Sequence, residues 1–159
     1  MQSKFMLSNN AKKEISAEIS KFPEKKAALL PALHIAQKEE GWISKETMEE
    51  IASTLEIKPI EVMEVVSFYT MFNMKPVGKY HLQVCTNLSC SLLNSRHMVN
   101  YLQDKLGIKT GETTEDNKYT LSTVECLGSC GTAPMMQVND EFHENLTNQK
   151  IDALLEKLK

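Results

Sequence analysis

Four cysteines in two close pairs constrain this chain more than any other feature of its sequence. Cys85 and Cys90 follow the pattern C-x4-C, and Cys126 and Cys130 follow C-x3-C. We expect the chain to remain in a reducing compartment, because residues 1–7 are too short for the apolar core of a signal peptide. In such a compartment paired cysteines hold metal or perform redox work more often than they form stapling disulfides. We therefore expect the two cysteine pairs to bind metal or to take part in redox chemistry.

The first half of the sequence has the apolar periodicity of helices. Ser8 or Asn10 is suited to cap the first helix and Ser44 the third, and we expect Pro31 to kink the second helix or mark its true start. Residues 8–72 are thus predicted to form a four-helix bundle. The four apolar stripes are Leu7, Ala11, Ile15, Ile19 and Phe22; Leu29, Leu30, Leu33 and Ala36; Met48, Ile51, Ala52 and Leu55; and Val62, Met63, Val66 and Tyr69.

Residues 67–72 (SFYTMF) concentrate aromatic and methionine side chains at the end of the predicted fourth helix. Such a stripe is either a partner-binding surface or part of a helix core. We interpret it as core with room for an exposed edge, because aromatic and methionine side chains at helical spacing are more often buried.

A change of apolar period after residues 75–78 (KPVG) marks a second domain. Alternating apolar and polar side chains predict strands over residues 80–85 and 119–125, which lead into Cys85 and Cys126 in turn. A helix is predicted between these strands, and a hairpin and a final helix after them. The supporting residues are Leu92, Val99, Leu102 and Leu106; the turn pair Asn139-Asp140; and Ile151, Leu154, Leu155 and Leu158.

We therefore expect an α+β chain with two domains, over residues 1–74 and 75–159. The predicted order of strand, helix and strand would bring the cysteine pairs of the second domain together. Two strands joined by a long helix run parallel through a right-handed crossover, so their carboxyl ends emerge at one edge of the sheet. The loops that follow should carry the second cysteine of each pair to the same place. Four thiolates around one point predict a metal centre.

The residues alone leave the identity of this centre open. Four cysteines also make a closed structural zinc site, although zinc knuckles usually separate paired cysteines by two residues. The longer loops here suit a two-iron cluster, but the plant-type ferredoxin spacing is not matched. A disulfide pair and a dithiol oxidoreductase also remain alternatives, and the second of these lacks the usual C-x-x-C at a helix start.

Charge and composition exclude several other functions. The chain has 18 Lys plus Arg and 21 Asp plus Glu, a net charge of −3, which is too even for a polyanion binder. We therefore expect no nucleic-acid partner. No apolar run approaches the roughly 20 residues that span a bilayer, so we expect no membrane insertion. The dinucleotide pattern G-x-G-x-x-G and the phosphate-binding pattern G-x-x-x-x-G-K-[ST] are both absent from the sequence.

Several segments together resemble one known family. They are residues 78–90 (GKYHLQVCTNLSC), 106–115 (LGIKTGETTE) and 124–134 (VECLGSCGTAP), with PALHIAQKEEGW and EVVSFYTMFNMKPVGKY upstream. Over nearly the whole chain this pattern is similar to the small iron-sulfur subunit of the peripheral arm of NADH:quinone oxidoreductase, respiratory complex I. The C-x4-C and C-L-G-x-C elements are its most specific parts.

The resemblance implies a thioredoxin-like ferredoxin domain behind the helical bundle, with one 2Fe-2S cluster. The family's ligand cysteines correspond here to Cys85, Cys90, Cys126 and Cys130. It also implies that the cluster exchanges single electrons with FMN on a partner subunit that oxidises NADH, so that this chain is not catalytic alone. A cluster exchanges one electron per step, whereas NADH delivers a two-electron hydride.

Further expectations about assembly follow from the resemblance. The partners would be the FMN- and NADH-binding subunit and the adjacent multi-cluster subunit. The chain would lie on the cytoplasmic side of the bacterial inner membrane, or on the matrix side in a mitochondrion. The equivalent subunits of NAD-linked hydrogenases and formate dehydrogenases share these motifs, so they are the alternative assignment.

Overall fold

A computed structural model describes residues 7–158 and divides the chain into two units, Met1–Pro76 and Val77–Lys159. Residues 1–6, which make up most of the segment considered above as a signal peptide, lie outside the described residues. None of the helices in the described part of the chain has the length and apolar character needed to cross a bilayer. The mixture of helices with a four-stranded sheet confirms the α+β class.

The first unit is helical, and its helix ends follow local sequence signals. The Ser8 and Ser44 hydroxyls accept hydrogen bonds from the third residue after each, as N-caps do. Pro31 lies in the first turn of its helix, where a missing N–H costs little, so it marks a start and not a kink. The elements are α1 (Asn9–Ile19), a 3-10 helix (Lys25–Ala28), α2 (Leu29–Glu40), α3 (Lys45–Leu55) and α4 (Pro59–Phe68).

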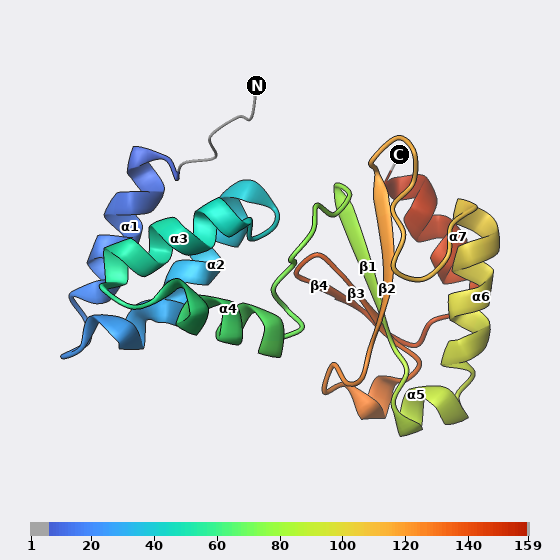
Figure 1. Ribbon diagram of the computed structural model, residues 1–159. Coiled ribbons are helices and arrows are strands. Elements are labelled where there is room, and N and C mark those ends of the chain that lie inside the picture. The colour runs from blue at the N-terminus through green and yellow to red at the C-terminus, as the bar shows by residue number, and fades with distance from the viewer. Residues whose placement is uncertain (1–6, 159) are drawn as a thin grey trace. The chain divides into compact units, whose positions relative to one another are not determined.

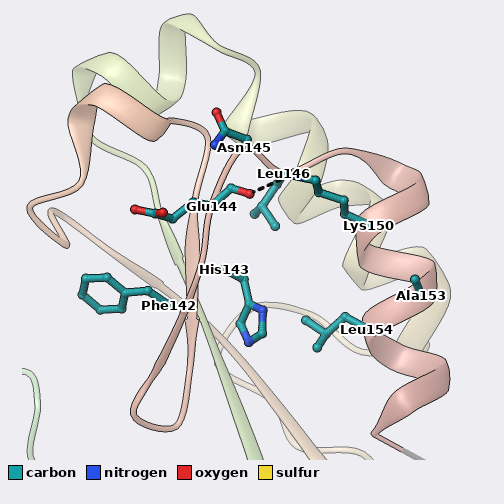
Figure 2. Close-up of a pocket in the computed structure, with 8 residues that line it drawn as sticks. All are labelled: Phe142, His143, Glu144, Asn145, Leu146, Lys150, Ala153 and Leu154. Carbon is teal, nitrogen blue, oxygen red and sulfur yellow. Dashed lines mark hydrogen bonds between the residues drawn. The ribbon is translucent and has the colours of Figure 1, made fainter.

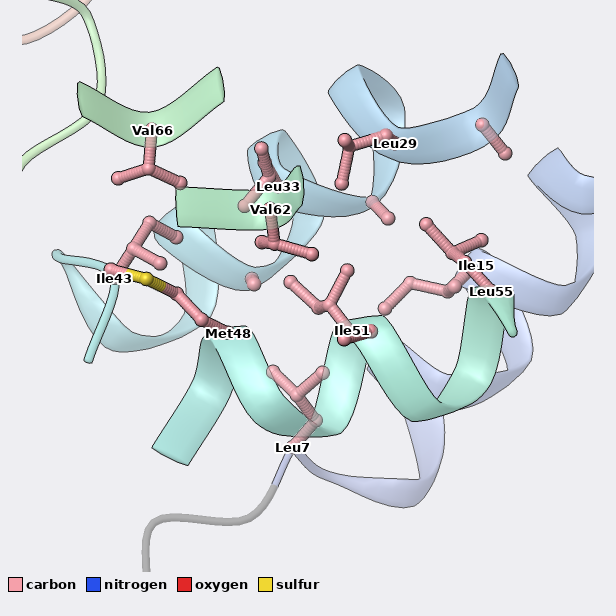
Figure 3. Close-up of a cluster of buried hydrophobic side chains, with 14 of the residues drawn as sticks. Leu7, Ile15, Leu29, Leu33, Ile43, Met48, Ile51, Leu55, Val62 and Val66 are labelled. Atoms are coloured by element: carbon pink, nitrogen blue, oxygen red, sulfur yellow. The ribbon is translucent and has the colours of Figure 1, made fainter. Parts of the chain in front are cut away.

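Side chains from all four α-helices meet in one apolar core, which Figure 3 shows. Ile15, Leu33, Ile51 and Val62 come from α1, α2, α3 and α4 in turn, and each is at most 1% exposed. The carboxylate of Glu50 on α3 accepts a hydrogen bond from the backbone N–H of residue 7 at 2.9 Å, which ties the start of the described chain to this core. The arrangement of these helices as a bundle stays a prediction.

Several side chains that the sequence placed on buried stripes of the first unit are exposed, among them Leu30 at 36% and Met63 at 47%. Phe22 lies beyond the end of α1 and is 38% exposed, so it does not continue the buried stripe. Residues 67–72 were expected in the core, but Phe68, Tyr69 and Met71 are exposed and only Phe72 is buried. The physical reason is that α4 ends at Phe68, after which the chain turns and loses helical spacing.

The second unit contains a sheet of strand order β2-β1-β3-β4. The strands are β1 (Tyr80–Cys85), β2 (Tyr119–Val124), β3 (Met136–Val138) and β4 (Glu141–His143). β1 and β2 run parallel, as the strand-helix-strand order predicts, with Cys85 opposite Val124. β3 pairs antiparallel with both β1 and β4, which confirms the predicted hairpin at Asn139-Asp140.

The connection between β1 and β2 differs from the single helix that we expected. It contains two helices, α5 (Leu88–Leu92) and α6 (Ser95–Leu106), separated by Asn94 in the left-handed conformation at φ +68°. Asparagine is one of the few residues other than glycine that adopts this conformation readily. Leu92 is therefore not on the buried face of the longer helix, and it is 74% exposed.

One face of the sheet is covered by α6 and by α7 (Asn148–Lys157), as Figure 1 shows. The core between them includes Leu82, Leu102, Leu121 and Ile151, each 0% exposed. Because side chains alternate along a strand, the neighbours of Leu82 and Leu121 point to the opposite face. Gly78 precedes β1 where a Cβ would lie 2.9 Å from backbone atoms of the residues at the start of β2, so the chain needs glycine there.

The core of the first unit can be tested by fluorescence, because the chain's single tryptophan, Trp42, belongs to this unit. Ile51 is 0% exposed, and Ile51→Ala is expected to lower the free energy of unfolding by about 2–5 kcal/mol through the cavity it leaves. Urea denaturation followed by tryptophan fluorescence measures this change. Ile60→Ala is the matched control, since Ile60 is 56% exposed and its loss should cost less than about 0.5 kcal/mol. Equal losses in both variants would contradict the core assignment.

Candidate metal centre

Three chain segments meet at one edge of the sheet in the second unit. β1 ends at Cys85, whose partner in the register is Val124, the last residue of β2, so Cys126 follows two residues beyond that edge. The backbone N–H of Cys85 donates to the carbonyl of Met135 at 3.1 Å, immediately before β3. The segment that contains Cys130 therefore leaves this edge after β2 and returns to it at β3. Both cysteine loops are anchored at the same place.

The first pair is buried. Cys85 and Cys90 are 4% and 3% exposed, and they share a small apolar cluster with Met135 that is separate from the main core of the sheet. The loop between the two cysteines is closed by Ser91, whose hydroxyl donates to the carbonyl of Thr86 at 2.7 Å. This hydrogen bond holds α5 against the end of β1, and so it fixes where Cys90 lies.

The second pair is exposed. Cys126 and Cys130 both lie on the loop between β2 and β3, and Cys130 begins a 3-10 turn that ends at Thr132. The backbone N–H of Gly128 donates to the sulfur of Cys126 at 3.3 Å. Gly128 adopts φ +75°, a conformation that favours glycine, and this lets the chain turn back around the sulfur. A backbone donor at this distance stabilises negative charge on a thiolate.

Burial and neighbouring thiols both shift the pKa of Cys90 upward. Burial is the main cause that raises the pKa of Cys90, and a hydrogen bond with the Cys85 thiol and the charges of Cys85 and Cys130 raise it further. The backbone of Met135 acts in the opposite direction. A bound cation reverses this balance, because it stabilises thiolates directly. The surroundings of Cys90 therefore favour its neutral thiol, and a bound metal would favour its thiolate.

The structure brings some of the predicted ligands together and leaves one apart. Cys85 and Cys90 form one cluster, and Cys130 lies within electrostatic range of Cys90. Cys126 has no such link to the others in the described residues. Within residues 7–158, no three His, Cys, Asp or Glu side chains already stand where they could hold a metal ion. The convergence of all four sulfurs on one point stays a prediction.

The donor set nonetheless fits an iron-sulfur cluster. All four cysteines are free thiols, and thiolate sulfur is the ligand of 2Fe-2S clusters and of structural zinc. The loop that carries the exposed pair begins and ends at the edge that holds the buried pair, so the ligands come from segments already joined by backbone hydrogen bonds. The four thiol ligands and the common anchoring of their loops are both compatible with an iron-sulfur cluster.

Two features of this region were missed by the sequence analysis. Met135 is 1% exposed and packs against the first cysteine pair, although its position in the sequence suggested only a strand residue. Glu144 accepts hydrogen bonds from Ser129 and Thr132 on either side of Cys130. No local pattern links residues so far apart, because their contact arises from the strand register.

A cavity of about 460 Å³ lies elsewhere in the second unit, between β4 and α7. Figure 2 shows His143 and Leu154 pointing toward one another across it, and its lining contains none of the four cysteines. The cavity therefore holds none of the predicted ligands, although Glu144 in its lining also contacts the residues on either side of Cys130.

Comparisons with known proteins point to one kind of iron-sulfur protein. A family model described as thioredoxin-like [2Fe-2S] ferredoxin matches residues 15–159. The NADH-quinone oxidoreductase subunit designated E 2 in Rhizobium meliloti (strain 1021) is 47% identical over 145 residues, which cover 91% of this chain and 86% of the relative. The NADH-quinone oxidoreductase subunit designated E in Rickettsia conorii (strain ATCC VR-613 / Malish 7) is 46% identical over 143 residues, which cover 88% and 86%.

A solved structure shares the fold. The crystal structure of an NAD+-reducing [NiFe]-hydrogenase in the air-oxidized state matches with a TM-score of 0.72 and 25% sequence identity. The match covers 82% of this chain but only 22% of the hydrogenase chain, so this chain spans about a fifth of that neighbour's length. The likeness therefore concerns one region of a longer protein.

Substitution of single cysteines tests the ligand assignment. Cys85→Ala and Cys126→Ser are each expected to lose most of the roughly two iron atoms that a 2Fe-2S chain binds, and to destabilise the second unit, because the metal holds together loops with little core of their own. Iron and acid-labile sulfide analysis measures the first effect. Ser89→Ala, in the same loop as the first pair, keeps all four thiols and should retain full iron. Full iron content in either cysteine variant would remove that residue from the ligand set.

Proposed function

The chain belongs to the thioredoxin-like [2Fe-2S] ferredoxin family, and from this premise we propose that Cys85, Cys90, Cys126 and Cys130 hold one 2Fe-2S cluster. We infer that the protein is the small electron-transfer subunit of NADH-quinone oxidoreductase, respiratory complex I. The observation that carries this proposal is that two loops, each with a pair of free cysteines, are anchored at one edge of the sheet. A cluster of this type, when bound, accepts and returns one electron at a time.

The chain's own residues would divide the work of holding this group. Cys85 and Cys90 supply two sulfurs in a water-poor setting, and the Gly128 N–H supports negative charge on Cys126. The exposed pair leaves the other side of the centre accessible to a partner. NADH delivers a hydride, which carries two electrons, so the hydride-accepting site with its FMN has to lie on a partner subunit. The chain is therefore a part of an oxidoreductase that is not catalytic alone.

The two predicted domains would then have separate tasks. We propose that residues 75–159 hold the cluster and that residues 1–74 form a helical bundle that adds docking surface. The exposed aromatic and methionine side chains at and after the end of α4 support such a surface, because they follow one another closely and a contiguous apolar patch marks an interaction site. The partners would be the FMN- and NADH-binding subunit and the adjacent multi-cluster subunit, on the cytoplasmic side of the membrane. Free thiols agree with that reducing compartment.

A second assignment is the equivalent subunit of an NAD-linked hydrogenase. The shared fold with an NAD+-reducing [NiFe]-hydrogenase favours it. The higher sequence identity to the subunits of NADH-quinone oxidoreductase supports the first assignment. In both assignments the chain performs the same single-electron task beside a partner that exchanges electrons with the nicotinamide nucleotide.

Reduction by NADH tests the proposed function. The isolated chain should be reddish brown and give an EPR signal with dithionite, but NADH alone should not reduce it because the chain has no hydride-accepting site. After co-purification with the flavoprotein partner, NADH should produce the same signal in EPR. A colourless chain that contains zinc would contradict the assignment, and so would a bound cluster that never changes redox state in the complex.

Exposed leucines beside the first cysteine pair provide a separate test of docking. Leu88, Leu92 and Leu93 are 70%, 74% and 52% exposed on and after the short helix that carries Cys90. Leu92→Glu should weaken co-purification with the flavoprotein partner at least tenfold while iron content stays unchanged, because a charge would enter an apolar contact. Leu92→Met keeps the apolar character and should bind as the wild type does. Undiminished binding of Leu92→Glu would place the contact elsewhere.

A further inference from the structure

The carboxylate of Glu144 is held by two hydroxyl groups that flank Cys130. Its Oε1 atom accepts hydrogen bonds from Ser129 Oγ and from Thr132 Oγ1, the second at 2.6 Å. Figure 2 shows this carboxylate pointing away from Lys150, whose ammonium group instead donates to the backbone carbonyl of Glu144 at 3.2 Å. The hydrogen bonds from Ser129 and Thr132 lower the pKa of Glu144, so the group is ionised near neutral pH.

These contacts use the hydroxyl protons of Ser129 and Thr132. A hydroxyl group has one proton to donate, and both of these protons have an acceptor in Glu144. The two hydroxyl oxygens also lie 2.7 Å apart, so they form one compact network with the carboxylate. Neither hydroxyl is then free to donate to a sulfur atom of the centre beside it.

The backbone reinforces this network. The N–H of Asn145 donates to the carbonyl of Thr132 at 2.7 Å, and the N–H of Leu146 donates to the carbonyl of Pro134 at 2.8 Å. The chain after β4 therefore runs alongside the chain after Cys130 and is joined to it at two points. These two bonds bring the backbone of Glu144 beside the turn, and its side chain adds the contacts to Ser129 and Thr132.

The negative charge of Glu144 and its capture of two hydroxyl donors would both lower the reduction potential of a bound cluster. The reduction potential of an iron-sulfur cluster depends on nearby net charge and on hydrogen bonds to its sulfur atoms. A negative charge disfavours the reduced form, which carries one more electron. The capture of two hydroxyl donors removes hydrogen bonds that would favour the reduced form.

We propose that Glu144 is a positioning residue for Cys130. It fixes the turn Cys130–Thr132 at the edge of the sheet and keeps the Ser129 and Thr132 hydroxyls directed away from the ligand sulfurs, which holds the potential of the bound cluster low. This inference rests on the proposed function, because it requires a cluster at Cys130. It deepens that function by assigning a role to a residue outside the cysteine pairs.

The test compares three variants of the full chain loaded with its cluster. Glu144→Gln keeps an oxygen acceptor for the hydroxyls but loses the charge, and its potential should be more positive than that of the wild type at unchanged iron content. Glu144→Ala also frees the hydroxyls, so it should shift the potential further and lose iron to a chelator several-fold faster. Glu141→Gln is the control, because it removes the same charge from an exposed side chain at the start of β4.

EPR-monitored redox titration and iron release measure these effects. A potential for Glu144→Ala equal to that of Glu144→Gln, with both chains loaded, would overturn the positioning role while the proposed function stands. A wild-type chain without two irons and labile sulfide would instead overturn the proposed function. If Glu144→Ala does not fold, Glu144→Asp takes its place, because it keeps the charge but withdraws the carboxylate from the two hydroxyls. A potential for Glu144→Asp equal to that of the wild type then overturns the positioning role.

Discussion

The parallel pairing of β1 with β2 is the constraint on which the rest of the second unit depends. Side chains alternate between the two faces of a sheet, so a slip of one residue would expose the core leucines, Leu82 and Leu121. The core thus pins the register, and the register fixes the positions of the loops beyond the strand ends. The cysteines occupy those loops. Apolar packing on one side of the sheet therefore determines the geometry of a polar site at its edge.

The candidate metal centre itself has little packing of its own. Its buried part consists of Cys85, Cys90, Ala133 and Met135, a cluster separate from the core under α6 and α7. What holds the loops is a set of backbone hydrogen bonds to strands that are already ordered, together with the carboxylate network at Glu144. The core thus secures the fold, and the hydrogen bonds around the loops position the cysteine side chains.

Features of this fold that depend on residues close together in the sequence could be predicted, and features that depend on distant residues could not. The strand at residues 80–85 and the hairpin turn were predictable because alternation and turn chemistry are local signals. The break at Asn94 was missed because the apolar spacing continues across it, and only the left-handed backbone interrupts the helix. The exposure of Phe68 could not be predicted, because the spacing of apolar residues in the sequence does not indicate which elements pack together. The contacts of Glu144 come from the register of distant strands, so the sequence carries no signal for them.

The cysteine motifs, by contrast, identified the family when read together with the segments that flank them, whereas their spacing alone left zinc and an iron-sulfur cluster as alternatives. The unequal burial of the four cysteines has a consequence for reactivity. Cys126 and Cys130 are exposed whereas Cys85 and Cys90 are buried. A thiol reagent dissolved in water therefore meets the outer pair first, and alkylation would distinguish the two pairs by rate.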